Sequence, residues 1–237
     1  CFQSNNTVEN TILSKQVQKE LFDDIELFIN SESLYSERGI DYKRGYMLFG
    51  PPGCGKSSSI KAIANKYNLP IFNLDLETIK TNSQLISLTN DILYEIPDRP
   101  YILTIEDFDR HEMFKDKWSY NGRSDKVTMQ CLLNVIDGIV ESHGRLLFIT
   151  CNDKSKIEEV SALVRPGRID RIVTLSHCDA YQASRLINNF FKSNIVIGDG
   201  NIEEEVTPAE LIKKMQTTQS VDAVLHYICK QPELVAK

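Results

Sequence analysis

The chain has 237 residues, of which 41% are hydrophobic and 25% charged, which leaves room for one globular domain and a small second one. Its formal net charge of −6 argues against nucleic acid as a sequence-independent partner, because a phosphate backbone needs a basic surface. No apolar run reaches transmembrane length, and no signal peptide is recognised. Because the chain begins at Cys1 rather than Met, we expect an excised piece, with membrane contact only through a missing N-terminal region.

Six cysteines and four histidines are spread along the chain. No two cysteines form a C-x-x-C pair, and several lie inside predicted strands or helices. We therefore expect reduced, buried thiols and an intracellular compartment. The scattered histidines predict no metal site.

An amphipathic helix is predicted near the N-terminus, where Val17, Leu21, Ile25 and Phe28 recur at helical spacing. The polar segment that follows, residues 31–44, is expected to be a connector.

The stretch GPPGCGKS then follows a short apolar run and precedes a helical pattern. It matches the G-x-x-x-x-G-K-[ST] phosphate-binding loop in the order strand, loop, helix. Its glycines let successive N–H groups point at phosphate oxygens, and the helix dipole is directed to the same place. Lys56 supplies a cation for the outer phosphates, and the Ser57 hydroxyl can ligate Mg²⁺. The predicted nucleotide-binding residues are Gly50, Pro51, Pro52, Gly53, Cys54, Gly55, Lys56, Ser57 and Ser58.

A glycine- and proline-rich turn that fits the pattern by chance is the alternative interpretation of this stretch. The flanking strand and helix favour the phosphate loop, since they are the context that its chemistry requires. The sequence therefore predicts binding of a nucleoside triphosphate.

Two more strands are predicted, at residues 70–76 and 101–105, separated by a helix at residues 85–96 that Pro97 closes. The second strand ends in Glu106 and Asp107. Acids at this position hold Mg²⁺ and polarise the attacking water in phosphate-loop proteins. The alternative is a pair of solvated acids that cap a strand.

A helix through residues 129–140 and a strand at residues 145–150 follow. Asn152 comes directly after this strand, so in a sheet of this class it lies beside the γ-phosphate and can orient the water. A simple turn role for Asn152 is an equally valid interpretation of the pattern.

A short helix at residues 157–164 leads into the turn Arg165-Pro-Gly-Arg168, and a fifth strand follows at residues 172–175. On a rigid turn both arginines project outward. Taken alone they are surface charges, but in a ring-forming triphosphatase they can reach a neighbour's γ-phosphate as arginine fingers.

Only helices are predicted from Asp179 onward, and Thr207 to Glu210 forms a capping box with proline at the first helical position. We place a domain boundary near Ser176. The predicted fold is an α/β three-layer domain with a central parallel sheet, residues 1–176, and a small all-helical lid, residues 177–237.

Cys54 carries a separate hypothesis. It lies at a helix start among N–H dipoles, a setting that lowers the pKa of a thiol and would make it reactive. The alternative is that Cys54 is a small residue that fills the loop.

Together these features resemble the AAA ATPase module, and within it the Bcs-type family, the mitochondrial chaperones that assemble the cytochrome bc complex. Four segments carry the resemblance: YSERGIDYKRGYMLFGPPGCGKSS at 35–58, the acid pair at 106–107 in the order Glu-Asp, VTMQCLLNVIDGI at 127–139 and ALVRPGRID at 162–170. The similarity covers essentially the whole chain.

The resemblance implies an ATPase that uses ATP and Mg²⁺ and forms a homo-oligomeric ring, a hexamer or heptamer, acting on a protein client. In this resemblance Glu106 occupies the position next to Mg²⁺, and Asp107 occupies that of the catalytic base. Asn152 occupies the sensor position next to the γ-phosphate. Arg165 and Arg168 take the finger positions. The implied location is the mitochondrial inner membrane for a eukaryotic member, and otherwise cytoplasmic or viral.

Three other functions are considered. A threading unfoldase is disfavoured because residues 77–85 lack an aromatic–apolar–glycine loop. A nucleic-acid motor or clamp loader is disfavoured by the acidic balance. A non-hydrolysing scaffold is disfavoured by the complete set of acids, asparagine and arginines. Contacts to adenine are expected near Ile12 and the lid.

Overall fold

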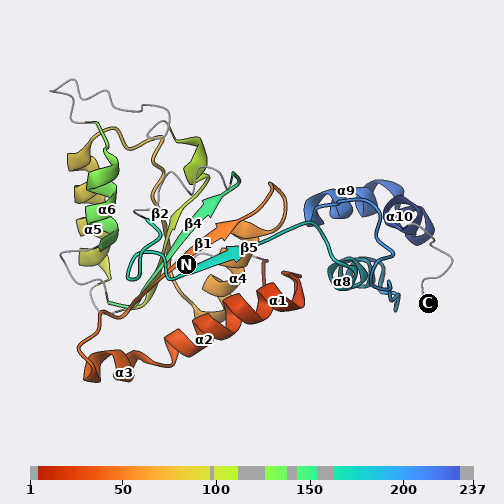
Figure 1. The fold of residues 1–237 in the computed structure, drawn as a ribbon, viewed down its shortest axis with the longest axis horizontal. Helices are drawn as coiled ribbons and strands as arrows, with labels where there is room; N and C mark the ends of the chain where they lie inside the picture. Colours follow the sequence, from red (N-terminus) through yellow and green to blue (C-terminus); the bar gives the residue numbers. More distant parts are fainter. Residues whose placement is uncertain (1–4, 97–98, 112–125, 138–142, 154–162, 230–237) are drawn as a thin grey trace.

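A computed structural model describes residues 5–96, 99–111, 126–137, 143–153 and 163–229, and it shows a central sheet, flanking helices and a separate helical group (Figure 1). Pro97, Val140 and residues 157–162, which were assigned to predicted helix ends and to a short helix, lie outside the described residues.

The sheet has five parallel strands in the order β2-β3-β4-β1-β5, which confirms the predicted central parallel sheet. All five predicted strands are found, with small differences at their ends. The strands are β1 (Lys43–Phe49), β2 (Ile71–Asn73), β3 (Tyr101–Ile105), β4 (Arg145–Cys151) and β5 (Arg171–Thr174).

Strand β2 is shorter than its apolar pattern predicts, because a turn begins at Asp75. The side chain of Asp75 accepts a hydrogen bond from the backbone N–H of Glu77 at 3.0 Å, and its carbonyl oxygen accepts one from the N–H of Thr78 at 3.1 Å. An Asx turn of this kind offers the backbone an alternative to the sheet ladder.

Seven α- and π-helical segments lie around the sheet in the part of the chain that the structure describes. A turn of π-helix interrupts the predicted N-terminal helix and separates α1 from α2. The segment expected to be a connector contains a short helix, α3. The segments are α1 (Lys15–Gln18), a π-helical turn (Lys19–Asp23), α2 (Asp24–Ile29), α3 (Glu32–Glu37), α4 (Lys56–Tyr67), α5 (Asn82–Glu95) and α6 (Met129–Asp137).

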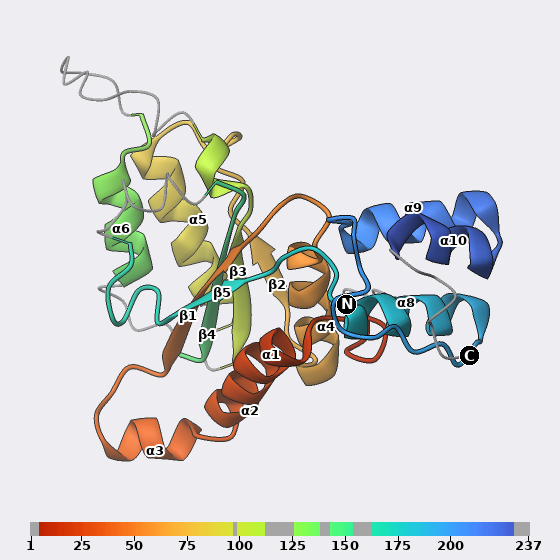
Figure 2. The ribbon, with the colours of Figure 1, turned by 45° about the vertical axis from the view of Figure 1, so that its right-hand side comes forward.

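Helices cover both faces of the sheet, because alternate side chains of each strand point to opposite faces. On β1, Tyr46 and Leu48 belong to the core shared with α1, α2 and α4, whereas Met47 belongs to the core shared with α5 and α6. Figure 2 shows these helices on opposite sides of the strands. The result is the predicted three-layer architecture.

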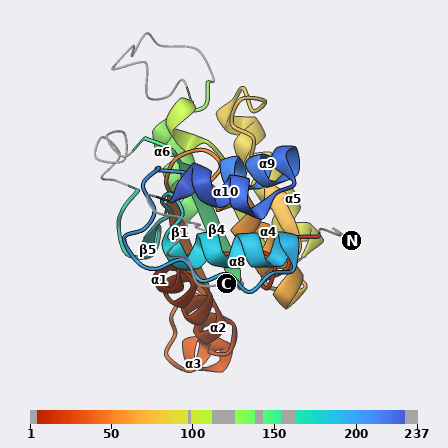
Figure 3. The ribbon, with the colours of Figure 1, turned by 90° about the vertical axis from the view of Figure 1, so that its right-hand side faces the viewer.

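Three further helices form a group of their own, α8 (Ala180–Phe191), α9 (Pro208–Thr218) and α10 (Val221–Ile228). The predicted capping box at Thr207 is confirmed, with Pro208 in the first turn, and Asp179 forms a second one at the start of α8. These helices enclose a separate apolar core and lie together to one side of the sheet (Figure 1); Figure 3, viewed from that side, shows them in front of the strands. In the part of the chain that is described, no helix combines the length and apolarity needed to cross a bilayer.

The N-terminal segment joins the two parts of the molecule. Ile12 is buried in the core of the helical group, and the next residue, Leu13, is buried in the core of the sheet. Gln182 of α8 donates its side-chain N–H to the carbonyl oxygen of Ile12 at 3.3 Å. A second link runs from the N–H of Ala209 to the carbonyl oxygen of Gly53 at 3.1 Å.

A partly buried carboxylate, that of Asp24, fastens α2 to the sheet. Asp24 accepts hydrogen bonds from Arg44 at 2.7 Å and from the Tyr46 hydroxyl at 2.7 Å, and Arg171 of β5 lies 3.3 Å away. Burial alone would raise the pKa of Asp24, but the hydrogen bonds from Arg44 and Tyr46, helped by the arginine charges, hold this pKa below its ordinary value. Asp24 therefore stabilises the fold as an anion.

We expect Asp24→Asn to lower the free energy of unfolding at pH 7 by about 2 kcal/mol, the usual contribution of charge-assisted hydrogen bonds. Because the folded-state pKa is depressed, the contribution is complete above the unfolded-state pKa of about 3.9 and is lost as pH falls through the lower folded-state value. Urea unfolding between pH 7 and pH 3 should show the difference shrinking with acid. Asp23→Asn, on an exposed neighbour, is the control, and an equal effect of both substitutions would refute the role of Asp24.

Candidate nucleotide-binding site

The sheet topology brings three predicted segments to one place. The chain leaves the neighbouring parallel strands β1 and β4 toward opposite edges of the sheet. After β1 it runs to β2 at one edge, and after β4 it runs to β5 at the other. Such a switch point opens a crevice at the carboxyl ends of parallel strands. The predicted phosphate loop follows β1, Asn152 follows β4, and Asp107 follows the adjacent β3.

The loop after β1 has a backbone shape that depends on glycine, as two of its positions illustrate. Gly50 has φ +149°, and a Cβ there would lie 1.9 Å from the carbonyl oxygen of Leu175. Gly55, with φ +100°, directly precedes α4. This backbone turns the loop around the start of α4, where unpaired N–H groups and the helix dipole favour an anion.

Lys56 lies at the centre of the loop and is buried. Its ammonium group donates to the carbonyl oxygens of Gly50 at 2.6 Å and Pro51 at 3.1 Å, and to Oδ1 of Asn152 at 2.8 Å. All three acceptors are neutral, so these bonds leave the charge of Lys56 uncompensated. A phosphate oxygen is the stronger partner for such a cation.

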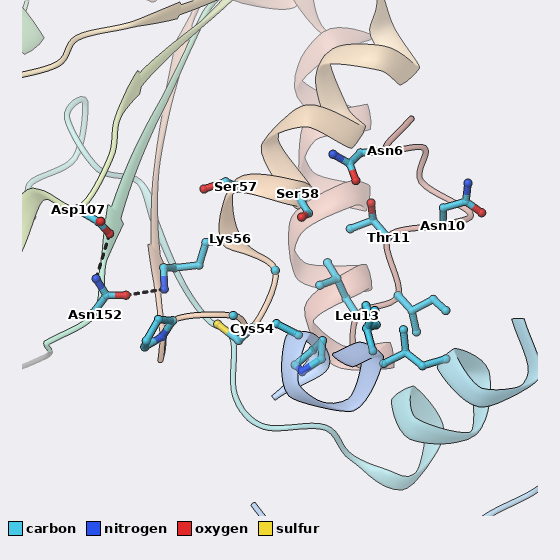
Figure 4. A pocket seen from close by; sticks show the side chains of 18 of the residues that line it. Asn6, Asn10, Thr11, Leu13, Cys54, Lys56, Ser57, Ser58, Asp107 and Asn152 are labelled. Carbon is cyan, nitrogen blue, oxygen red and sulfur yellow. Dashed lines mark hydrogen bonds between the residues drawn. The ribbon is translucent and has the colours of Figure 1, made fainter. Parts of the chain in front are cut away.

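Asn152 links Lys56 to Asp107 (Figure 4). Its Nδ2 donates to Oδ1 of Asp107 at 3.0 Å, while its Oδ1 accepts from Lys56. Asp107 has a left-handed backbone, φ +48°, and its N–H donates to the Thr150 hydroxyl at 2.9 Å. A non-glycine residue adopts this conformation only where its surroundings hold it there. The three side chains form one hydrogen-bonded row along the cleft.

Asp109 is a part of the site to which the sequence pattern assigned no role. It is buried, and its two carboxylate oxygens accept from the N–H groups of Asn152 at 3.1 Å and Asp153 at 3.3 Å. These bonds fix the backbone that carries Asn152. The signal in the sequence was a second acid two positions after Asp107, at the end of the same strand.

A cleft of about 400 Å³ extends from this row to the helical group. Residues of the N-terminal segment between Asn6 and Leu13 form one wall of the cleft. The sequence predicts contacts of this segment only near Ile12. The Thr11 hydroxyl is buried and makes no hydrogen bond within the described part of the chain. Residues that line the cleft are Asn6, Asn10, Thr11, Ile12, Leu13, Pro52, Gly53, Cys54, Gly55, Lys56, Ser57, Ser58, Asp107, Arg110, Asn152, Leu186, Pro208, Ala209 and Ile212.

The donor groups present suit a nucleoside triphosphate. The glycine loop and Lys56 face the phosphate end, Ser57 offers a hydroxyl for Mg²⁺, and apolar side chains of the N-terminal segment and the helices offer a place for a base. Of the predicted residues, Gly50 and Pro51 do not line the cleft but hold Lys56 through their carbonyl oxygens. Glu106 is exposed at the strand end, outside the lining residues.

The two predicted fingers differ in this chain. Arg165 is exposed, as expected for a group that projects outward. Arg168 instead folds back and pairs through two nitrogens with the carboxylate of Asp137, at the end of α6. The hydrogen bonds from Arg168 hold the pKa of Asp137 below its ordinary value. The prediction that both arginines project outward is therefore wrong for Arg168, because the sequence could not show this acceptor.

Cys54 also departs from the reactive-thiol hypothesis. Its side chain is 1% exposed, and its sulfur lies against the loop backbone, 3.0 Å from where a Cβ on Gly50 would be. Burial raises the pKa of the Cys54 thiol, and this effect outweighs the opposing charge of Lys56. Cys54 is thus the small residue that fills the loop, which was the alternative interpretation.

The sheet, the glycine loop and the row of polar side chains define a P-loop nucleoside triphosphate-binding protein. The model for the ATPase family associated with various cellular activities (AAA) matches residues 46–177, and the chain belongs to this family.

Relatives of the chain confirm the likeness to the Bcs type. An AAA-ATPase of Arabidopsis thaliana is 36% identical over 231 residues, covering 93% of this chain and 50% of the relative. The probable mitochondrial chaperone BCS1-A of Dictyostelium discoideum is 38% identical over 195 residues, covering 80% and 45%. The mitochondrial chaperone BCS1 of Danio rerio is 31% identical over 208 residues, covering 85% and 48%. The chain thus spans about half the length of these relatives.

The buried thiols should resist alkylation in the native protein. Burial raises the pKa of Cys151 to about 11 and that of Cys178 to about 12, and it also raises that of Cys54. At pH 7.5 we expect iodoacetamide to label these three roughly tenfold or more slowly than the partly exposed Cys131, since the thiolate is the reacting form. Peptide mapping by mass spectrometry, with a urea-unfolded control, measures the rates. Rapid labelling of Cys54 that ATP prevents would restore the reactive-thiol hypothesis.

Proposed function

We propose that this protein is an ATP-hydrolysing motor of the Bcs type, which works as a ring to move or assemble a protein client. The observation that carries the proposal is the row Lys56–Asn152–Asp107, which places a cation, an amide and a carboxylate along one wall of the cleft. This set matches the parts that phosphoryl transfer to water requires.

ATP would bind with its phosphates on the loop from Gly50 to Ser58 and its adenine among apolar side chains. Ile12, Leu13, Leu186 and Ile212 line the far part of the cleft and suit a base. Lys56 would exchange its backbone acceptors for outer phosphate oxygens. The start of α4 adds unpaired N–H groups directed at the same oxygens.

Asp107 would polarise the attacking water, and Asn152 would orient it beside the γ-phosphate. Water then adds to the γ-phosphorus as the bond to the bridging oxygen of ADP breaks, and the water proton passes to Asp107 or to the released phosphate. Mg²⁺, when bound, supplies charge neutralisation on the outer phosphates. Ser57 and the exposed Glu106 would hold it.

The ring is proposed because the finger arginines lie outside the cleft of their own chain. Arg165, and Arg168 once it leaves Asp137, would act on the site of the next subunit, as a hexamer or heptamer allows. We further propose residues 1–176 as the ATPase domain and residues 177–237 as its lid, with the cleft between them. Separate apolar cores on the two sides of the cleft support this division.

The client is proposed to be a protein, because relatives are named mitochondrial chaperones. A net charge of −6 gives no support to a nucleic-acid partner. A mitochondrial inner-membrane location is proposed if the source is eukaryotic, because relatives are named mitochondrial chaperones.

Lys56→Ala should abolish measurable ATP binding, because the buried cation that meets the outer phosphates is lost. Asp107→Asn should still bind ATP, at least as tightly as wild type, but lose about 10²-fold or more in turnover, since the water then lacks its base. Fluorescent-nucleotide titration and phosphate release measure the two effects. Asp75→Asn, at a turn outside the cleft, is a matched control, and wild-type turnover by Asp107→Asn would overturn the assignment of the base.

Arg168→Ala should bind ATP normally and lose a factor of about 10³ in turnover, as expected for an arginine finger. The sites are shared in a ring, so mixing Arg168→Ala with Asp107→Asn should partly restore activity. Wild-type turnover per subunit should also rise steeply with protein concentration. Arg185→Ala, on the exposed face of α8, is the control, and full activity in a dilute monomer would contradict the finger role.

A further inference from the structure

We propose that Arg110 is a γ-phosphate-binding residue that acts within its own subunit, and that it leaves Asp107 when ATP binds. The site would thereby distinguish a triphosphate from a diphosphate. This inference rests on the proposed function and adds a residue to it that neither the phosphate loop nor the finger turn contains.

The first argument is the distribution of positive charge in the cleft. Among the described residues that line it, Lys56 and Arg110 are the ones with cationic side chains. Lys56 is buried and held by three oxygen atoms. A nucleoside triphosphate with its Mg²⁺ still carries excess negative charge, so a second cation at the same wall has a clear partner.

The second argument is that the backbone of Arg110 is fixed while its side chain is free to move. Arg110 ends a short 3₁₀ turn, Phe108–Arg110, and its N–H donates to the carbonyl oxygen of Asp107 at 2.9 Å. Phe108 and Asp109 in this turn are both buried. The Arg110 side chain is 60% exposed, so its guanidinium can move into the cleft at a small cost in packing against the described residues.

The third argument is the state of Asp107. Asn152 donates to its Oδ1 at 3.0 Å, and the guanidinium of Arg110 lies 3.3 Å from its Oδ2. Each oxygen of the proposed base thus has one partner, and on Oδ2 this partner is a cation that competes with an attacking water for the oxygen. An exposed ion pair of this length is weak, whereas a phosphate offers a guanidinium more charge and a bidentate geometry.

These contacts together describe an exchange. With ADP bound, or with the site free of nucleotide, Arg110 stays on Oδ2 of Asp107. With ATP bound, Arg110 moves to the outermost phosphate, and Oδ2 becomes available to accept a hydrogen bond from the attacking water. The same movement would therefore strengthen triphosphate binding and release the base.

The test compares the binding of a non-hydrolysable ATP analogue and of ADP, in the presence of Mg²⁺, for wild type and Arg110→Gln. We expect Arg110→Gln to weaken analogue binding about 10-fold or more, the usual effect of one charge-assisted hydrogen bond, and to leave ADP binding within about twofold. Arg185→Gln is the matched control, because that arginine is also exposed but lies on α8 outside the cleft. Equal changes for both nucleotides, or no change, would refute the inference.

A double-mutant cycle adds a second readout. Asp107→Asn frees Arg110 from its ion pair, so it should tighten analogue binding more when Arg110 is present than in the Arg110→Gln background. Identical effects in the two backgrounds would also refute the exchange. If wild type binds neither nucleotide, or if Lys56→Ala binds both as well as wild type, the proposed function itself fails. If Arg110→Gln binds both nucleotides and the ratio of analogue affinity to ADP affinity is the same as in wild type, the role of Arg110 is refuted while the proposed function stands.

Discussion

The register between β1 and β4 is the constraint on which the site depends. The two strands pair over their full length, and Phe49 lies opposite Cys151. The next residue on each side, Gly50 and Asn152, therefore leaves the sheet at the same height, and the N–H of Gly50 donates to the carbonyl oxygen of Cys151 at 3.2 Å. A slip of one residue would reverse the two faces of the strand and separate Lys56 from Asn152.

Much of the fold could be predicted from the sequence, because its signals are local. Buried parallel strands appear as continuous apolar runs, as in residues 101–105. The glycine loop and the capping box at Thr207 are each recognised by residues at fixed spacing. The same holds for the residues that begin the site, since Asp107 and Asn152 follow strands that the pattern locates and Lys56 has a fixed place in the loop motif.

The remaining features depend on pairs of residues that are distant in the chain. Asp137 accepts Arg168 from 31 positions away, and no local pattern shows that an arginine has such a partner. The direction of the Cys54 side chain follows from a packed interior rather than from the helix start beside it. Likewise, only the folded chain shows that Asp109 supports the backbone of Asn152, or that residues near the N-terminus form a wall of the cleft.

The adjacent residues Ile12 and Leu13, buried in two different cores, act as a mechanical tether between the sheet and the helical group. A single peptide bond joins them, so the segment has almost no slack. Widening the cleft must either withdraw Ile12 from its core, at a cost of about 2 kcal/mol, or pull on α1 through Leu13. A change in the cleft width would thus be transmitted to α1 and, through α2, to the Asp24 contacts on β1 and β5, which couples the N-terminal helices to the width of the cleft.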